Sequence, residues 1–242
     1  MNKHAAILID LLRSHAESEH KFDICPYLQR VTLDIICETA MGICLGSQHN
    51  PNVPYLTNML RFMEIMSDRN IHPWKHSDFI FYNFTSDGRE VNNVLKKLHG
   101  FTNKVISERE QTLNESERNN CQESMKKKKI AFLDLLLEMK RNGNLTLEEV
   151  REETDTFMFE GHDTTSHNLM WAIYCFGRYR ECQEAAQAEI DDILGNDQLE
   201  IPTMDKLGQM KYLECCIKES QRLYPPVPVI GRKMEKPLPI GR

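Results

Sequence analysis

The sequence predicts a mainly α-helical protein with a small β part. Apolar side chains recur three and four residues apart through most of the 242 residues, which is the spacing of one face of an α-helix. Short β-like segments occur only near the end, at residues 227–230 and 238–240. A chain of this length can bury a substantial hydrophobic core.

The expected helices follow one another with short connections. Pro26 precedes the second helix and Gly46 is its expected stop, because proline suits a first helical turn and glycine suits the residue after a last turn. A polar tract at residues 112–129 lacks apolar spacing, so we expect a surface loop there. In chain order, we expect helices at about 2–19, 27–45, 55–68, 89–111, 130–141, 146–179, 181–194 and 211–224.

Charge and cysteine content exclude some classes of function. The chain carries 30 Lys and Arg against 36 Asp and Glu, a net charge of −6, which argues against nucleic-acid binding. Its eight cysteines lie mostly within helical patterns, which favours a reducing compartment over disulfides or zinc. We find neither a signal peptide pattern nor the ~18 uninterrupted apolar residues of a membrane span.

The long helix expected at 146–179 should begin with a capping box formed by Thr146 and Glu149. Its middle contains residues that an apolar helix normally avoids, in the segment Phe157–Thr165. Relative to alanine, the glycine and two threonines there make helix formation less favourable by about 2 kcal/mol. Such a cost indicates a compensating role for this segment.

Glu160, Asp163 and Thr164 are three and four residues apart, so they share one arc of this helix, with Gly161 beside them. The pattern predicts a notch lined by acid and alcohol groups. Two carboxylates in an apolar site resist simultaneous ionisation, which suits proton delivery. A solvent-facing acidic stripe with a glycine kink explains the same residues, and His162 with Asp163 also fits half of a metal site.

Glu219 and Arg222 are three residues apart on the helix expected at 211–224 and can form an ion pair. The apolar face of that helix places the pair near the boundary of the core. Most pairs of this kind are surface pairs worth ~0–1 kcal/mol.

Together these motifs resemble those of a cytochrome P450. Residues 160–165 resemble the oxygen-activation motif of the family's long central helix, and Glu219-x-x-Arg222 resembles its Glu-x-x-Arg motif. The chain looks like a partial cytochrome P450 domain over 1–242, and it resembles the family-4, fatty-acid ω-hydroxylase-like group. The segments that carry this finer resemblance are 157–165, 212–215 and 230–232.

The resemblance implies a haem cofactor and roles for individual residues. Asp163 and Thr164 would relay protons to dioxygen, and Gly161 would leave room for the oxygen. Glu160 would form an ester to a haem methyl, and Arg232 would contact a haem propionate. Glu219 and Arg222 would be structural.

The implied reaction is monooxygenation, in which one oxygen atom of O2 enters a lipophilic substrate such as a fatty acid, hormone or xenobiotic. The implied electron donor is NADPH-cytochrome P450 reductase. The implied location is the cytosolic face of the endoplasmic reticulum membrane, reached through an N-terminal anchor that these 242 residues do not contain.

The family's axial cysteine follows the Glu-x-x-Arg helix in a glycine-containing loop, and no cysteine of this chain has that context. We therefore expect the 242 residues to be a partial sequence, inactive alone, of an active monooxygenase. The alternative is a truncated, non-catalytic helical interaction module. A reading frame that continues past Arg242 into a cysteine-containing loop would favour the first reading.

Overall fold

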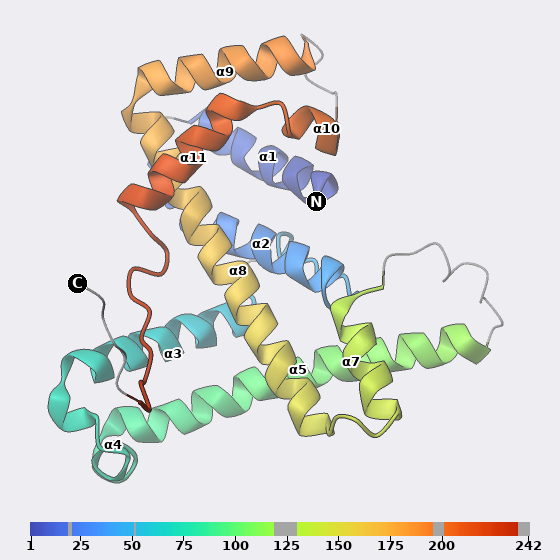
Figure 1. The fold of residues 1–242 in the computed structure, drawn as a ribbon, viewed down its shortest axis with the longest axis vertical. Helices are drawn as coiled ribbons and strands as arrows, with labels where there is room; N and C mark the ends of the chain where they lie inside the picture. The colour runs from blue at the N-terminus through green and yellow to red at the C-terminus, as the bar shows by residue number, and fades with distance from the viewer. Residues whose placement is uncertain (19–20, 51, 119–129, 196–200, 237–242) are drawn as a thin grey trace. The chain divides into compact units, whose positions relative to one another are not determined.

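The computed structural model describes residues 1–18, 21–50, 52–118, 130–195 and 201–236. These residues form two compact units, Met1–Asp163 and Thr164–Arg242. The boundary falls within one long helix, α8, which spans Leu147–Arg178. Figure 1 traces the chain, and the two units are described separately below.

In the first unit, the helices α3 and α5 lie side by side, joined at one end by a turn that includes α4 (Figure 1). The helix α1 contacts α2, and α7 contacts α5. The elements of this unit that precede α8 are α1 Asn2–Ala16, α2 Cys25–Thr39, α3 Pro54–Ile71, a 3-10 turn at Pro73–Lys75, α4 Asp78–Phe84, α5 Ser86–Arg118 and α7 Phe132–Arg141.

A single large apolar cluster forms the centre of this unit. It brings together Leu33 of α2, Ile106 of α5, Leu133 of α7 and Met158 of α8, all of them almost fully buried. Each of these helices therefore turns one apolar stripe to a common core, as the helical spacing in the sequence predicts.

The helix α2 ends at Thr39, six residues before the end expected at Leu45. Gly42 adopts a positive φ of 68°, and its carbonyl accepts a hydrogen bond from Arg109 Nη1 of α5 at 2.9 Å. The backbone N–H of Leu133 also donates to the carbonyl of Ala40 at 3.0 Å. These contacts with α5 and α7 replace the last turns of the helix, so the expected boundary at Gly46 was wrong.

The helix α5 continues to Arg118, so the loop expected at 112–129 is wrong for residues 112–118. The hydroxyls of Thr112 and Ser116 donate to carbonyls four residues back, at 2.9 and 2.8 Å. From α7, Arg141 Nη2 donates a hydrogen bond to Asn114 Oδ1 of this stretch at 2.7 Å. A side chain of a neighbouring helix thus supports a stretch that lacks apolar spacing. Residues 119–129 of the expected loop lie outside the described residues.

The long helix was predicted within one residue at each end. Its capping box is present: Glu149 Oε2 accepts the Thr146 N–H at 2.7 Å, and Thr146 Oγ1 accepts the Glu149 N–H at 3.2 Å. Thr146 Oγ1 also donates to Glu149 Oε2 at 2.8 Å, and the bonds from the Thr146 N–H and hydroxyl to the carboxylate lower the pKa of Glu149. The start of α8 is therefore fixed by local sequence.

The second unit contains the end of α8 and three further helices. Glu189 of α9 accepts the backbone N–H groups of Tyr212 and Leu213 at 2.8 and 2.9 Å, which anchors the start of α11. These bonds lower the pKa of the Glu189 carboxyl. The three helices are α9 Arg180–Leu194, α10 Met204–Leu207 and α11 Lys211–Leu223.

Helices dominate the described residues, which confirms the mainly α class. No strand occurs among those residues, and residues 227–230, where we expected one, have no strand alongside. A strand needs a partner to hydrogen-bond its backbone. The other expected segment, 238–240, lies outside the described residues. No described helix has the length and apolar character needed to cross a membrane.

Candidate functional site

Glu160, Gly161 and Asp163 lie within a single turn of α8, at the end of the first unit. The Glu160 side chain is exposed, whereas Asp163 is half-buried. Burial of the thiol, followed by the charges of Asp23 and Asp163, raises the pKa of Cys25. The two carboxylates therefore differ in their surroundings: Glu160 lies at the surface, whereas Asp163 is half-buried.

The space beside Gly161 is filled by a side chain of α2. A Cβ atom at this position would lie 2.7 Å from Ile36 Cδ1 and 2.9 Å from Ile36 Cγ1. Glycine is thus needed here for the close approach of Ile36 to α8. The notch predicted at Gly161 is occupied on this side by Ile36.

His162, between these residues, belongs to the core. Its side chain is 1% exposed, and its Nδ1 lies 2.7 Å from the carbonyl oxygen of Met158. Its ring also packs near the Tyr55 ring, with centroids 5.6 Å apart. Among the described residues there is no group of three or more His, Cys, Asp or Glu side chains placed to hold a metal ion. The interpretation of His162 and Asp163 as half of a metal site is therefore not supported.

A cavity of about 220 Å³ lies within the first unit, and Glu160 forms part of its wall. One water molecule needs only about 10–15 Å³ of such space, so this cavity has room for part of a ligand. Most of its wall is apolar. The lining residues are Tyr55, Met59 and Phe62 of α3, Leu95, Leu98 and His99 of α5, and Asp155, Thr156, Phe159 and Glu160 of α8.

A polar network holds one side of this cavity. Asp155 accepts hydrogen bonds from Thr102 Oγ1 at 2.5 Å and from Arg151 Nη1 at 2.9 Å. His99 Nε2 lies 3.8 Å from the same carboxylate. Burial, followed by the charge of Asp155, raises the pKa of Tyr55 well above its usual range. The bonds of Asp155 hold α5 against α8, so the two helices that line the cavity keep their relative position.

The second unit contains the other residues that the sequence singled out. Thr164 is its first residue and is half-buried on α8. On α11, Arg222 Nη2 and Nε donate to the two carboxylate oxygens of Glu219 at 2.6 and 2.7 Å. Both side chains are more than half exposed. The expectation that this pair lies at the core boundary is therefore wrong for this structure.

Arg232 lies in the irregular segment after α11 and is exposed. Its Nη1 donates to the carbonyl of Gly231 at 2.9 Å. The structure thus brings Glu160, Gly161 and Asp163 together on α8, and pairs Glu219 with Arg222 on α11. Arg232 joins neither set.

The side chains available for a haem group fit it in part. Glu160 offers an accessible carboxylate at the wall of an apolar cavity, and Arg232 offers an exposed cation that suits a carboxylate group. The space at Gly161, in contrast, is taken by Ile36. The side of α8 that suits a haem group is therefore the exposed side that carries Glu160.

Comparisons of the sequence with known proteins identify its family. The family profile described as Cytochrome P450 matches residues 1–241. The chain belongs to the cytochrome P450 family. This match covers both compact units.

The curated relatives extend the match to one branch of the family. Cytochrome P450 4d2 of Drosophila melanogaster is 39% identical over 96% of this chain and 48% of its own length. Cytochrome P450 4c3 of the same organism is 40% identical, over 99% and 46%. Human cytochrome P450 4V2 is 40% identical, over 98% and 46%. The similarity to family 4 predicted from the motifs is confirmed, and the chain spans about half the length of these relatives.

Sequence reasoning missed the cavity and its lining residues. Tyr55, Leu98 and Phe159 are far apart in sequence, and each reads as an ordinary apolar helical position. Only their meeting in space defines the cavity, so no local signal was available to find it.

Proposed function

We propose that this chain is part of a haem-thiolate monooxygenase that inserts one oxygen atom of O2 into a lipophilic substrate, such as a fatty acid, hormone or xenobiotic. The observation that carries the proposal is Glu160, which lies on the family's oxygen-activation motif and lines a mostly apolar cavity. An apolar cavity with a few polar groups at one side suits a lipophilic ligand.

Haem, when bound, supplies the activation of dioxygen that this reaction needs. Glu160 would hold the haem through an ester to a haem methyl, since its carboxylate is exposed. Esterification removes one negative charge from an arc that also contains Asp163, which relieves their repulsion. Arg232 would hold a haem propionate.

Asp163 and Thr164 would move protons at the reaction site. Both side chains are half-buried on one stretch of α8, where a carboxylate and a hydroxyl can each hold a proton and pass it on. Gly161 lets Ile36 approach α8 and so fixes the helix that positions these groups. Glu219 and Arg222 would have a structural role on α11.

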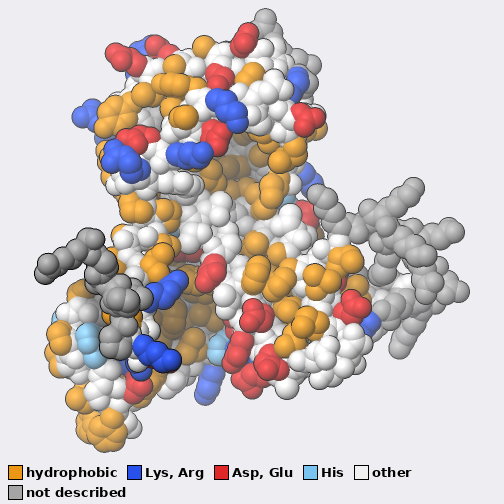
Figure 2. Space-filling model, viewed as in Figure 1, with side chains coloured by type: hydrophobic (Ala, Val, Ile, Leu, Met, Phe, Trp, Pro, Cys, Tyr) orange, Lys and Arg blue, Asp and Glu red, His pale blue; other side chains and the backbone are white. Residues whose placement is uncertain are grey.

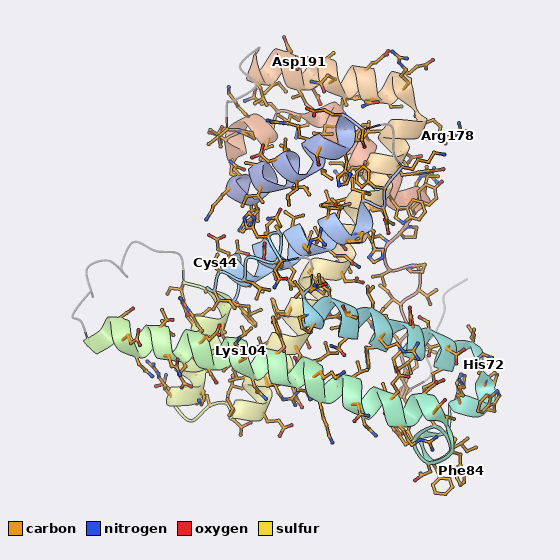
Figure 3. The ribbon with its side chains drawn as sticks, turned by 180° about the vertical axis from the view of Figure 1, so that it is seen from behind. Cys44, His72, Phe84, Lys104, Arg178 and Asp191 are labelled. Atoms are coloured by element: carbon orange, nitrogen blue, oxygen red, sulfur yellow. The ribbon has the colours of Figure 1, made fainter. Side chains whose placement is uncertain are left out.

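The proposed electron donor is NADPH-cytochrome P450 reductase, and the proposed location is the endoplasmic reticulum membrane. One surface of the first unit supports membrane contact. Large apolar side chains at the end of α3, in the 3-10 turn and on α4 are exposed, and Figure 2 shows them gathered at the tip of this unit. Phe84 points away from the ribbon there (Figure 3). The exposed side chains are Ile71, Trp74, Phe79, Ile80, Tyr82 and Phe84.

The test of the proposed class is the reduced carbon-monoxide spectrum of the full protein that contains this chain. We expect a thiolate-type Soret band from the full protein and none from residues 1–242 alone. The same band from residues 1–242 alone, or its absence from a folded, haem-loaded full protein, would contradict the proposal.

The proposed role of Glu160 predicts covalent haem in the full protein. Glu160→Ala should release haem on acid-organic extraction, whereas the wild type retains it. Glu153→Ala is a matched control, since Glu153 is also an exposed glutamate of α8. Equal retention of haem by the two variants would exclude the ester.

A further inference from the structure

A second cavity, of about 270 Å³, lies within the second unit and has an unusual lining. Of the seven described cysteines, all of them free thiols, four line this one cavity: Cys175 of α8, Cys182 of α9, and Cys215 and Cys216 of α11. The rest of the wall is mostly apolar. The proposed monooxygenase function uses none of these thiols.

Two of the four thiols share one hydrogen-bonding partner. The Tyr212 hydroxyl bonds to both Cys182 and Cys216, and these contacts help to raise the pKa of Tyr212. A hydroxyl can donate to one sulfur while it accepts from the other thiol. Cys182 and Cys216 therefore face the same point from two different helices.

The helix register explains why these two residues meet. Glu189 binds the backbone at Tyr212 and Leu213, so α9 and α11 are held together at that point. Cys182 is seven residues before Glu189 and lies on the same face of α9. Cys216 is four residues after Tyr212, one turn along the same face of α11. In Figure 3, Asp191 marks the part of α9 near Glu189, and Arg178 marks the end of α8 just before Cys182.

We propose that Cys182 and Cys216 form a redox-active dithiol, which a hydroperoxide oxidises to a disulfide that joins α9 to α11. The empty space beside the thiols lets their side chains turn toward each other. Tyr212 is 41% exposed, so its ring can swing into solvent as the sulfur atoms approach. Both cysteines are partly exposed and thus reachable by a small oxidant.

The chemistry balances with hydrogen peroxide as oxidant. One sulfur attacks a peroxide oxygen and becomes a sulfenic acid, with release of one water molecule. The other sulfur then displaces the hydroxyl group, and a second water molecule leaves. The two thiols lose two protons and two electrons in total, and one peroxide is reduced to two waters. Burial raises the pKa of Cys216, so this thiol is the slower nucleophile and suits the second step.

The other two thiols are less suited to this bond. Cys215 is next to Cys216 on α11 and is the more exposed of the two. Cys175 lies on α8, and neither it nor Cys215 is among the groups that shift the pKa of Tyr212. Cys215 therefore provides a matched control, because it lines the same cavity and lies beside the proposed partner.

The test is peptide mapping of the full protein after treatment with hydrogen peroxide. Trypsin releases residues 181–206, which contain Cys182, and residues 212–218, which contain Cys215 and Cys216. After alkylation without reduction, we expect these two peptides as a linked pair, lighter than their sum by two hydrogens and separated by a reductant. Fragment ions from cleavage of the backbone between residues 215 and 216 show which of these two cysteines carries the disulfide, so the wild-type protein alone assigns the bond.

The variants sharpen the assignment. Cys215→Ser should keep the linked pair, and Cys216→Ser and Cys182→Ser should abolish it. A linked pair that persists in Cys216→Ser, or wild-type fragments that place the bond at Cys215, would overturn the proposal. Two results with the wild-type protein would also overturn the proposal. In the first, both thiols still react with the alkylating agent after peroxide treatment; in the second, each thiol is oxidised but no disulfide forms.

Discussion

The first unit is built around a core, whereas the second is not. Among the described residues, both apolar clusters of buried side chains lie within residues 1–163. Among the described residues of 164–236, the buried apolar side chains are Ala172, Ala186 and Met210, while Val229 is 80% exposed. Helices of similar amphipathic pattern thus reach different degrees of burial.

The difference shows what holds each unit together. In the first unit, apolar burial supplies most of the free energy of folding. In the second, directed contacts at helix ends replace it: Glu189 binds the start of α11, and the ring of Trp171 stacks on Tyr224 with centroids 4.2 Å apart. The second unit should therefore respond more to changes of single polar groups than to trimming of its leucines.

The largest expected effect is at a core leucine of the first unit. Leu133 of α7 is 0% exposed, and Leu223 of α11 is 45% exposed. In the full protein, Leu133→Ala should lower the free energy of unfolding by about 2–5 kcal/mol, and Leu223→Ala by at most about 0.5 kcal/mol. Denaturant unfolding measures both. Equal losses of unfolding free energy in the two variants would show that apolar burial does not distinguish the first unit from the second.

A smaller effect is expected at the turn that ends α2. Gly42 and Gly46 both have positive φ, 68° and 67°, but only a Cβ at Gly42 would meet a neighbour, the Arg109 guanidinium, at 2.6 Å. Gly46→Ala should cost about 1 kcal/mol from backbone strain, and Gly42→Ala about 2–3 kcal/mol because the guanidinium must also move. Thermal unfolding of the two variants tests this, and a larger loss for Gly46→Ala would show that Arg109 does not fill this space.

The smallest expected effect on stability is at Glu189 in the second unit, and it depends on pH. Bonds from the backbone of α11 lower the pKa of Glu189 below its unfolded value. Its contribution to stability is therefore present above the unfolded pKa of about 4.3 and is lost as the pH falls through the lower folded value.

Glu189→Gln should therefore lower the melting temperature of the full protein at neutral pH, and the difference from wild type should shrink in acid. Glu184→Gln is the matched control, because Glu184 lies on the same helix but pairs only with exposed Arg180 among the described contacts. A difference between Glu189→Gln and wild type that is independent of pH would mean that the carboxylate charge does not anchor α11.

Local features of the fold were predictable because their causes are local. Thr146 and Glu149 are three residues apart and form the predicted capping box. Glu219 and Arg222 form an ion pair across one helical turn, as their spacing allows. The arc of Glu160 and Asp163 on α8 likewise follows from spacing alone.

The sequence by itself determined the helical class, the limits of α8, the motif residues on it and the family to which they point. The tertiary structure decided that α2 ends at Thr39, that α5 continues to Arg118 and that Ile36 fills the space at Gly161. It also decided which residues line the two cavities. The first group depends on neighbours within one helical turn, while the second depends on contacts between residues far apart in sequence, whose free energies outweigh local preference.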